Sequence, residues 1–199
     1  MINYTNIKEY KSLPFESYIG LKGFSHSFLK NEQNGVARKI EVNDKMRLGS
    51  LVDAFLTQPD EIDFNSNLFD TARTIAIKIN EQFKDVIKHL EPQLSYSAET
   101  EFNGFKMPVC GRLDWLLRGI ADVDLKVTSA KNEKQFINLL FQMGYDNQQW
   151  NYAKMANVPK IYIMPFSTTS NRCLDLIELP VTETNKFWEE KILKFGTYE

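Results

Sequence analysis

Two short segments in the middle of the chain gather two carboxylates and an ammonium group that could act together. The first segment, GRLD, ends at Asp114, and the second, DLK, runs from Asp124 to Lys126. Side chains alternate along a β-strand, so Asp124 and Lys126 share one face. A hairpin centred on Gly119 sets Asp114 opposite Asp124, because the two positions are equidistant from it. Acidic groups are rarely buried alone, so we expect this set to be solvated, ion-paired or bound to a metal.

A second turn could bring a third acid to the same face. Asn103-Gly104 lies between two extended runs, which is the strongest short signal for a hairpin. With a two-residue turn there, Glu99 and Glu101 lie on the same sheet face as Asp114. Glu99 is the preferred candidate for the acidic set, and Glu101 is the alternative. A single β-bulge would shift this register.

The oxygen ligands in this set favour a magnesium site. Mg²⁺ prefers carboxylate and carbonyl oxygens and keeps several waters, which suits Asp114, Asp124 and the backbone carbonyl of Leu125. Mn²⁺ can substitute for it. A water made more acidic by the metal could attack a phosphodiester, and Lys126 would position that water, help to deprotonate it and offset developing negative charge. The alternative interpretation is a surface ion pair between one aspartate and Lys126.

The flanking sequence predicts the elements that must position these residues. Residues 1–44 are polar and weakly periodic, which indicates an N-terminal arm with one short helix that Ser25 can cap. Residues 45–199 form the core of a single domain. Expected helices cover 44–59, 68–90, 131–143, 146–156 and 182–195, and expected strands cover 96–102, 105–117, 121–128, 160–166 and 174–180. This order predicts a mixed α/β (α+β) fold, with a central mixed sheet that contains an antiparallel meander and is flanked by helices.

The chain resembles the PD-(D/E)XK nuclease superfamily, in its exodeoxyribonuclease VIII-like and phage lambda-type exonuclease branch. GRLD followed at ten residues by the Asp of DLK is similar to motifs II and III. Gln148 and Tyr152 have the Q-x-x-x-Y spacing of the exonuclease branch. LGSLVDAFLTQPDE, residues 48–61, is similar to the family helix that reads L-G-x-x-x-H-x-x-L…P, and FSHSFLK is similar to the short helix that opens these domains. The match covers residues 23–157 in order.

The resemblance implies a restriction-endonuclease-like core and carries over one further metal ligand. The family's helix histidine, which binds the metal, is Asp53 here. Aspartate is an oxygen ligand suited to Mg²⁺, so Asp53 is a candidate ligand. The alternative is an ordinary solvated helix residue. A second departure from the family is Val127, which stands where a threonine commonly follows DLK.

The resemblance also implies contacts to DNA. Gln148 and Tyr152 lie at i and i+4 on one helix face, and in the resembled family this helix flanks the active site and contacts the DNA backbone or the metal shell. Arg112 shares the face of Asp114 and could either touch phosphate or neutralise the acids. Lys131 is a further candidate for DNA binding.

These features predict a Mg²⁺-dependent deoxyribonuclease that hydrolyses phosphodiester bonds from the ends of duplex DNA, in phage-type recombination or DNA processing. A structure-specific or restriction-type endonuclease is one alternative, and a non-catalytic DNA- or protein-binding module is the other. The resemblance further implies a single-strand annealing protein as partner and a homo-oligomeric ring. Its central channel could gather basic residues: Arg38, Lys39, Lys126, Lys131, Lys134 and Lys154.

Composition is consistent with a folded cytoplasmic protein without a membrane anchor. Hydrophobic residues make up 43% and charged residues 25% of the 199 residues, which is typical of globular chains rather than disordered ones. The formal net charge of −2 gives no indication of nucleic-acid binding. Two cysteines exclude a disulfide framework and a four-cysteine metal site and favour a reducing compartment. No apolar run approaches the ~20 residues that span a bilayer.

Overall fold

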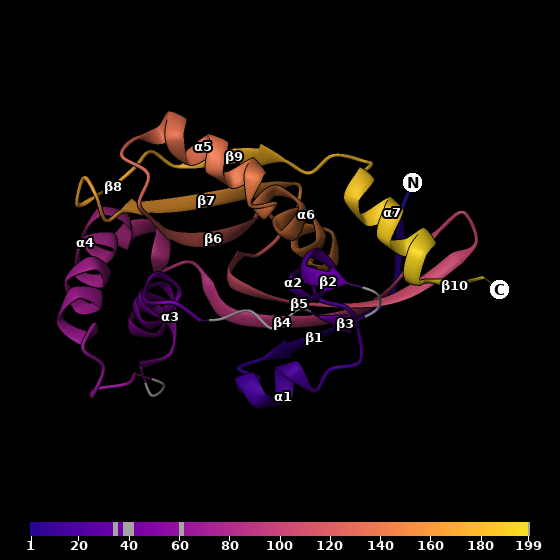
Figure 1. Ribbon diagram of the computed structural model, residues 1–199, viewed down its shortest axis with the longest axis horizontal. Helices are drawn as coiled ribbons and strands as arrows, with labels where there is room; N and C mark the ends of the chain where they lie inside the picture. The colour runs from indigo at the N-terminus through magenta and orange to yellow at the C-terminus, as the bar shows by residue number, and fades with distance from the viewer. Residues whose placement is uncertain (34–35, 38–41, 60–61, 199) are drawn as a thin grey trace.

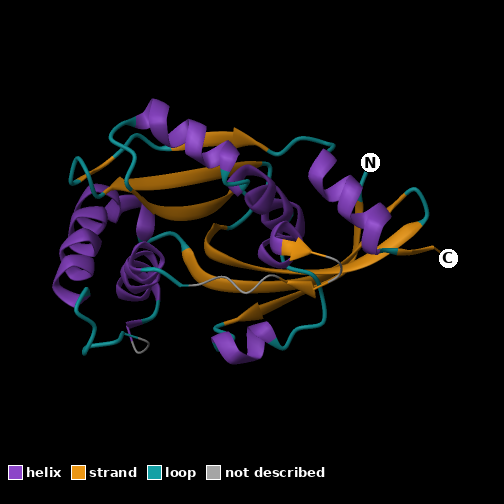
Figure 2. Cartoon of the chain, in the orientation of Figure 1, coloured by secondary structure: helices purple, strands orange, loops and turns teal. Residues whose placement is uncertain are grey.

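One mixed β-sheet runs through the molecule, and helices cover both of its faces (Figure 1). The computed structural model describes residues 1–33, 36–37, 42–59 and 62–198. Over these residues the order of helices and strands agrees with the expected fold class, a mixed α/β domain with an antiparallel meander at its centre (Figure 2).

The described strands and helices have the following bounds. The strands are β1 (Asn3–Lys11), β2 (Glu32–Gln33), β3 (Val36–Ala37), β4 (Glu91–Phe102), β5 (Phe105–Leu117), β6 (Ala121–Thr128), β7 (Lys160–Ser167), β8 (Arg172–Cys173), β9 (Ile177–Pro180) and β10 (Thr197–Tyr198). The helices are α1 (Phe15–Ile19), α2 (His26–Asn31), α3 (Asp44–Thr57), α4 (Phe69–Ile87), α5 (Glu133–Gln142), α6 (Tyr145–Ala156) and α7 (Lys186–Phe195).

The strand order in the main sheet is β1-β4-β5-β6-β7-β8, with β9 also paired to β7 and β10 to β5. Strands β4, β5 and β6 form the predicted antiparallel meander, whereas β6 and β7 run parallel. The first hairpin turns at Asn103 and Gly104, whose φ angles of 52° and 81° match the positive φ values that a tight turn of the primed type requires. Its register sets Glu99 opposite Pro108, as the sequence predicts.

Strands β5 and β6 pair over a short stretch only. Their ladder joins Trp115 to Val123 at one end and Leu117 to Ala121 at the other, which is the register expected for a turn at Gly119. Strand β6 then continues along β7 for its whole length. The sheet therefore opens beyond Trp115, and the next residues of both strands are released from mutual backbone pairing.

Two hydrophobic clusters hold the helices against the sheet. On one face, helices α3 and α4 pack against β5, β6 and β7, with the core residues Val52, Ile75, Ile79, Trp115, Val123, Leu125, Met164 and Phe166. On the other face, helices α2, α5, α6 and α7 pack against the sheet, with the core residues Leu29, Leu113, Phe136, Leu140, Trp150, Ile163, Trp188 and Ile192. The central strands are thus buried on both sides, as expected for the parallel part of a sheet.

Helices α2 and α3 begin where the sequence predicts because their capping side chains are present, whereas α7 begins four residues later than expected. The Ser25 hydroxyl accepts from the backbone N–H of Phe28 at 3.2 Å, and the Asn43 side chain accepts from Met46 at 3.1 Å. These bonds satisfy backbone N–H groups that a helix start leaves free. No described helix has the combined length and apolarity that crossing a bilayer requires.

The N-terminal segment differs from the expected arm over residues 1–44. Residues 3–11 form β1, which joins the central sheet as the antiparallel neighbour of β4. Seven of these nine residues are exposed, so the strand lacks the apolar alternation by which strands are recognised in a sequence. Its place at the sheet edge explains the polar composition, because one side of the strand has no neighbour to cover it.

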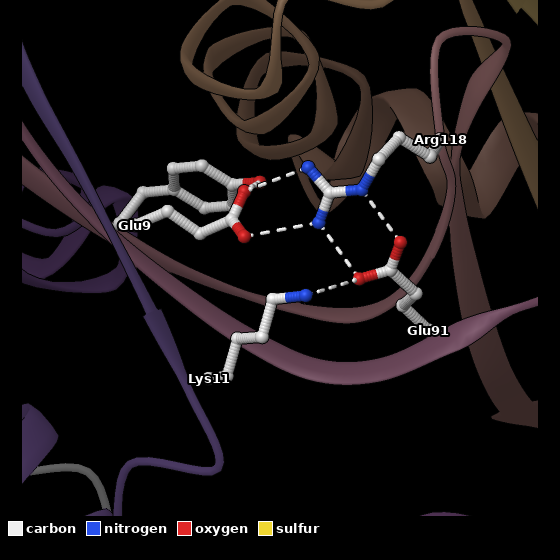
Figure 3. A network of polar contacts seen from close by, with 5 residues as sticks. Glu9, Lys11, Glu91 and Arg118 are labelled. Carbon is white, nitrogen blue, oxygen red and sulfur yellow. Dashed lines mark hydrogen bonds and ion pairs between the residues drawn. The ribbon is translucent and has the colours of Figure 1, made fainter.

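A network of charged side chains ties β1 to β4 and to the turn after β5 (Figure 3). The Arg118 guanidinium donates to both oxygens of Glu9 at 3.0 Å, and to the two oxygens of Glu91 at 2.5 and 2.7 Å. Lys11 also donates to Glu91, at 3.2 Å. The hydrogen bonds from Arg118 are the largest single cause of the lowered pKa of Glu9. They are also the largest cause of the lowered pKa of Glu91, which falls to about 2.

We expect Arg118→Met to lower the free energy of unfolding by about 1 kcal/mol at neutral pH, because the network is largely solvated and screened. A depressed carboxyl pKa contributes stability above the unfolded value near 4.5 that is lost as the pH falls through the folded value. The difference between parent and variant should therefore shrink below pH ~4.5 in urea titrations. Lys88→Met, which breaks one isolated exposed pair with Asp85, is the control. A pH-independent difference for Arg118→Met would contradict this account.

Candidate active site

Strand β6 places a polar face under helix α6. Ala121, Val123 and Leu125 belong to the cluster under α3 and α4, so the alternate residues Asp124 and Lys126 point to the opposite face. The sequence inference that these two side chains share a face is thus confirmed by their direct contact, since the Lys126 ammonium lies 2.6 Å from Asp124 Oδ1.

Asp114 closes the gap where β5 and β6 part. Its Oδ2 accepts a hydrogen bond from the backbone N–H of Leu125 at 3.0 Å. The last backbone pair between β5 and β6 joins Trp115 to Val123. Beyond it, the Asp114 carboxylate rather than a backbone carbonyl of β5 accepts the N–H of β6. The end of the ladder therefore fixes Asp114 beside the DLK segment.

Asp124 is almost completely buried and is held from two sides. Lys126 lies 2.5 Å from its Oδ2, and the Gln149 side chain of α6 donates to its Oδ1 at 2.7 Å. The Lys126 ammonium in turn lies 4.9 Å from the centre of the Tyr145 ring, at a distance suited to a cation–π contact. The alternative of a surface ion pair is wrong, because the side chains of Asp124 and Lys126 are only 4% and 18% exposed.

Burial disfavours the charged form of the site's acids, and a bound cation would stabilise that form. Burial raises the pKa of Asp124 to about 7 against the opposing effect of the Lys126 ammonium, and the charge of Asp114 raises it further. Burial by itself lowers the pKa of Lys126, but Asp124 and Asp114 outweigh this effect and hold that pKa above its usual value. Lys126 is therefore a protonated donor rather than a base in this state.

Asp53 lies at the same site, on helix α3. Its Oδ2 accepts from the side chain of Gln93 at 2.8 Å, and its Oδ1 accepts from the Thr57 hydroxyl at 3.3 Å. Burial and the neighbouring charge of Asp114 raise the pKa of Asp53 to about 8. Asp53 is thus not a solvated helix residue. The Gln93 carboxamide also accepts from Arg112 Nε, which connects the helix to β5.

Asp53 and its neighbours Gln93, Arg112 and Asp114 line a groove of about 940 Å³. Helix α3 provides one wall with Arg47, Ser50 and Asp53, and the segment around α1 provides residues such as Tyr18. The remaining lining near the acids is formed by Gln93, Arg112, Asp114 and Tyr152. Three of the candidate residues that the sequence assigned to metal or DNA therefore meet Asp114 in one concave site, namely Asp53, Arg112 and Tyr152.

The Q-x-x-x-Y pair contributes packing as well as polarity. Gln148 donates to the Tyr152 hydroxyl at 3.0 Å, as expected for positions i and i+4 of α6. The Tyr152 ring lies so close to Gly111 that a Cβ added there would meet the ring at 2.4 Å. The glycine of GRLD therefore allows α6 to approach β5, and this contact places α6 over the two aspartates.

Other candidate residues lie away from this site. Glu99 pairs with Pro108 and Glu101 with Lys106, whereas Asp114 lies opposite Gln93, six residues from Glu99 on β4 and hence about 20 Å away. Shared strand parity placed Glu99 on the correct face but at the wrong end of the strand. Lys131 is exposed in the loop before α5, outside the groove lining.

The proposed channel residues are scattered. Arg38 and Lys39 lie outside the described residues. Lys126 is buried within the site, and Lys154 lies 5.4 Å from the centre of the Trp150 ring. Lys134 is exposed on α5. Their common role therefore rests on the family resemblance alone.

The donor set fits a hard divalent cation if water completes its shell. Within the described ranges, no group of three or more His, Cys, Asp or Glu side chains lies close enough together to hold a metal ion. Asp114 and Asp124 offer two carboxylates, and the Leu125 carbonyl lies 3.5 Å from the Lys126 ammonium on the same side. Two carboxylates, one carbonyl and several waters are a combination that Mg²⁺ accepts.

Two buried glutamines of the site were missed from the sequence. Gln149 has no exposed surface and Gln93 is 5% exposed. A signal for Gln149 was available, since it is in phase with the buried Ala153 on α6, and a polar residue on a buried stripe needs a partner. No comparable signal exists for Gln93, whose partners come from α3 and β5.

Comparisons with known proteins address the fold. No protein-family model and no curated protein sequence matches the chain. Among solved structures, a protein from Eubacterium rectale that is provisionally named an exonuclease superimposes with a TM-score of 0.51 and 20% sequence identity, over 79% of this chain and 65% of that one. The chain has a nuclease-like fold. At this identity the likeness establishes the fold alone, and the chain spans less than two thirds of that protein.

Two Rai1 structures superimpose on this chain less closely than the Eubacterium rectale protein does. Rai1 from Scheffersomyces stipitis, in complex with (3'-NADP)+ and a calcium ion, is 16% identical over 50% of this chain and 29% of its own, with a TM-score of 0.31. Rai1 from Candida albicans, in complex with pU5 and Mn²⁺, is 12% identical over 51% and 32%, also with a TM-score of 0.31. At these scores neither structure carries an argument about this chain.

Proposed function

We propose that this chain is a divalent-metal-dependent deoxyribonuclease that hydrolyses phosphodiester bonds from the ends of duplex DNA. The observation that carries the proposal is the convergence of Asp114, Asp124 and Lys126 where β5 and β6 separate, beside a groove. The exonuclease name of the Eubacterium rectale protein, which shares the fold, supports the same reaction class.

Asp114, Asp124 and the carbonyl of Leu125 are the groups that would hold Mg²⁺ or Mn²⁺, with Asp53 beside them. When bound, such an ion supplies a more acidic water and positive charge near the phosphate. Lys126, kept protonated by Asp124 and Asp114, would donate hydrogen bonds to the phosphate oxygens as negative charge develops there. Gln149 holds the Asp124 carboxylate in one orientation through the 2.7 Å bond.

The remaining groove residues would hold the nucleic acid. Arg112 and Arg47 offer guanidinium groups for phosphates, and Tyr152, whose hydroxyl accepts from Gln148, lines the groove from α6. The annealing partner, the oligomeric ring and a role in phage-type recombination belong to the proposal through the family resemblance. Light scattering on the purified chain would test the ring.

The decisive test is an assay on linear and circular duplex DNA with Mg²⁺, against EDTA as control. We expect Mg²⁺-dependent loss of linear DNA from its ends and no change in closed circles. Nicking of circles would favour the endonuclease alternative. An inert protein that binds DNA would favour the non-catalytic module.

Binding should respond to salt if phosphates are the contacts. Each neutralised phosphate of duplex DNA contributes about −0.9 to the slope of log affinity against log salt concentration. Fluorescence anisotropy with a short duplex, in Ca²⁺ and over a range of KCl, measures this slope. A slope near zero would contradict a phosphate-binding groove.

A further inference from the structure

Gln93 occupies an unusual backbone position inside the site. Its neighbours Pro92 and Leu94 pair with Trp115 and Leu113, so Gln93 itself lies opposite Asp114. Its φ angle is 51°, in the left-handed region that residues other than glycine rarely adopt. Because such conformations cost about 1–3 kcal/mol, a buried residue held in one is a candidate for a specific task.

The Gln93 carboxamide binds an acidic side chain through its nitrogen and a basic side chain through its oxygen. Its Nε2 donates to Asp53 Oδ2 at 2.8 Å and to the Thr57 hydroxyl at 3.1 Å. Its Oε1 accepts from Arg112 Nε. Reversing the amide would set its NH₂ against the guanidinium and its oxygen against the carboxyl, so the two partners fix its orientation.

Asp53 and Arg112 lie on opposite sides of the Gln93 amide, since each forms a hydrogen bond with one end of it. Once Asp53 is ionised, its carboxylate and a guanidinium brought into direct contact would form a strong two-pronged ion pair. That pair would neutralise both groups and remove them from the groove surface. The neutral amide between them bonds to each and leaves their charges separate.

We propose that Gln93 is a positioning residue that holds the Asp53 carboxyl and the Arg112 guanidinium apart within the groove. The acid then faces the site of the cation and the guanidinium faces the substrate anion. The effect of Gln93 on the reaction rests on the proposed nuclease function, whereas its hydrogen bonds to Asp53 and Arg112 do not depend on that function.

The test uses Gln93→Met, which keeps the length of the side chain but removes both bonds from the amide. Arg112→Met and the double variant complete a cycle. Ser95→Ala is the matched control, because Ser95 is equally buried two residues further along β4. Circular dichroism establishes folding for each variant. Calorimetric titration with Mn²⁺ alone and the kcat and KM for a short DNA duplex are the measurements.

We expect Gln93→Met to weaken Mn²⁺ binding at least about tenfold and to raise KM in the parent background. In the Arg112→Met background the same change should cost less than about threefold in Mn²⁺ affinity, because no guanidinium is left to pair with Asp53. Ser95→Ala should match the parent.

Equal losses in both backgrounds, or no loss in either, would overturn the positioning role. A parent protein that binds Mn²⁺ and shows the expected cycle but cuts no DNA would retain the role of Gln93 and refute the proposed function. A folded parent that neither binds Mn²⁺ nor cuts DNA would refute both.

Discussion

Asp114→Ala, Asp124→Asn and Lys126→Met are each expected to lower the rate of DNA hydrolysis by about 10³-fold or more. The first two remove a carboxylate from the group that would hold the cation. The third removes the ammonium that lies 2.6 Å from Asp124 and that would donate to the phosphate in the proposed reaction. Single-turnover cleavage of a labelled linear duplex measures the rate, so that product release does not mask the effect.

Asp122→Asn is the matched control for Asp124→Asn. Both aspartates lie on β6, on the same face and almost fully buried. Burial, and after it the charge of Asp124, raises the pKa of Asp122 well above its ordinary value, which favours the neutral form that an amide resembles. An amide of the same shape should therefore leave the rate within about threefold of the parent. A rate for Asp124→Asn close to that of Asp122→Asn would contradict the assignment of the site.

Mn²⁺ is expected to raise the melting temperature of the protein strongly at pH 8.5 and only slightly at pH 6. A cation at about 1,000 times its Kd stabilises a protein by ~4 kcal/mol, which is ~8–16 °C for a domain of this size. Asp124 and Asp53 have pKa values raised to about 7 and about 8, so both hold protons at pH 6. Because the cation must displace those protons, its apparent affinity falls as the pH falls.

For the metal-free protein, the contribution of these acids to stability changes with pH in the opposite direction. Raised carboxyl pKa values mean that the folded chain binds more protons than the unfolded chain between the ordinary value near 4 and the raised values. These two acids therefore lower the stability as the pH rises through that window. Differential scanning fluorimetry from pH 6 to 8.5, with and without Mn²⁺, reads both trends. An equal shift at every pH, or an undiminished shift in Asp124→Asn, would exclude this site as the place of binding.

Much of the site was predictable because its geometry is local to a meander. The positive φ preference of Asn103-Gly104 and the position of Gly119 fix two hairpin registers. Strand parity then decides that Asp124 and Lys126 share a face. The helix starts followed in the same way from capping residues such as Asn43, whose side chain contacts a backbone group three positions later.

The tertiary structure decided what lies between the elements. Strand parity cannot tell how far along a strand a residue sits from the site, so Glu99 was placed on the correct face but at a remote position. Whether Asp53 faces solvent or Asp114 depends on how α3 packs against the sheet. The roles of Gln93 and Gln149 follow from partners on other elements.

The sequence by itself thus determined which face of β6 carries the acids and which residues form the DLK group. Only the tertiary structure decided where the β5–β6 ladder ends, since that end depends on β6 pairing with β7 and on the burial of Trp115 and Val123 beneath α3 and α4. Turn chemistry and strand alternation act over a few residues, whereas the meeting of α3, α6 and the opened sheet is fixed by packing between segments far apart in the chain.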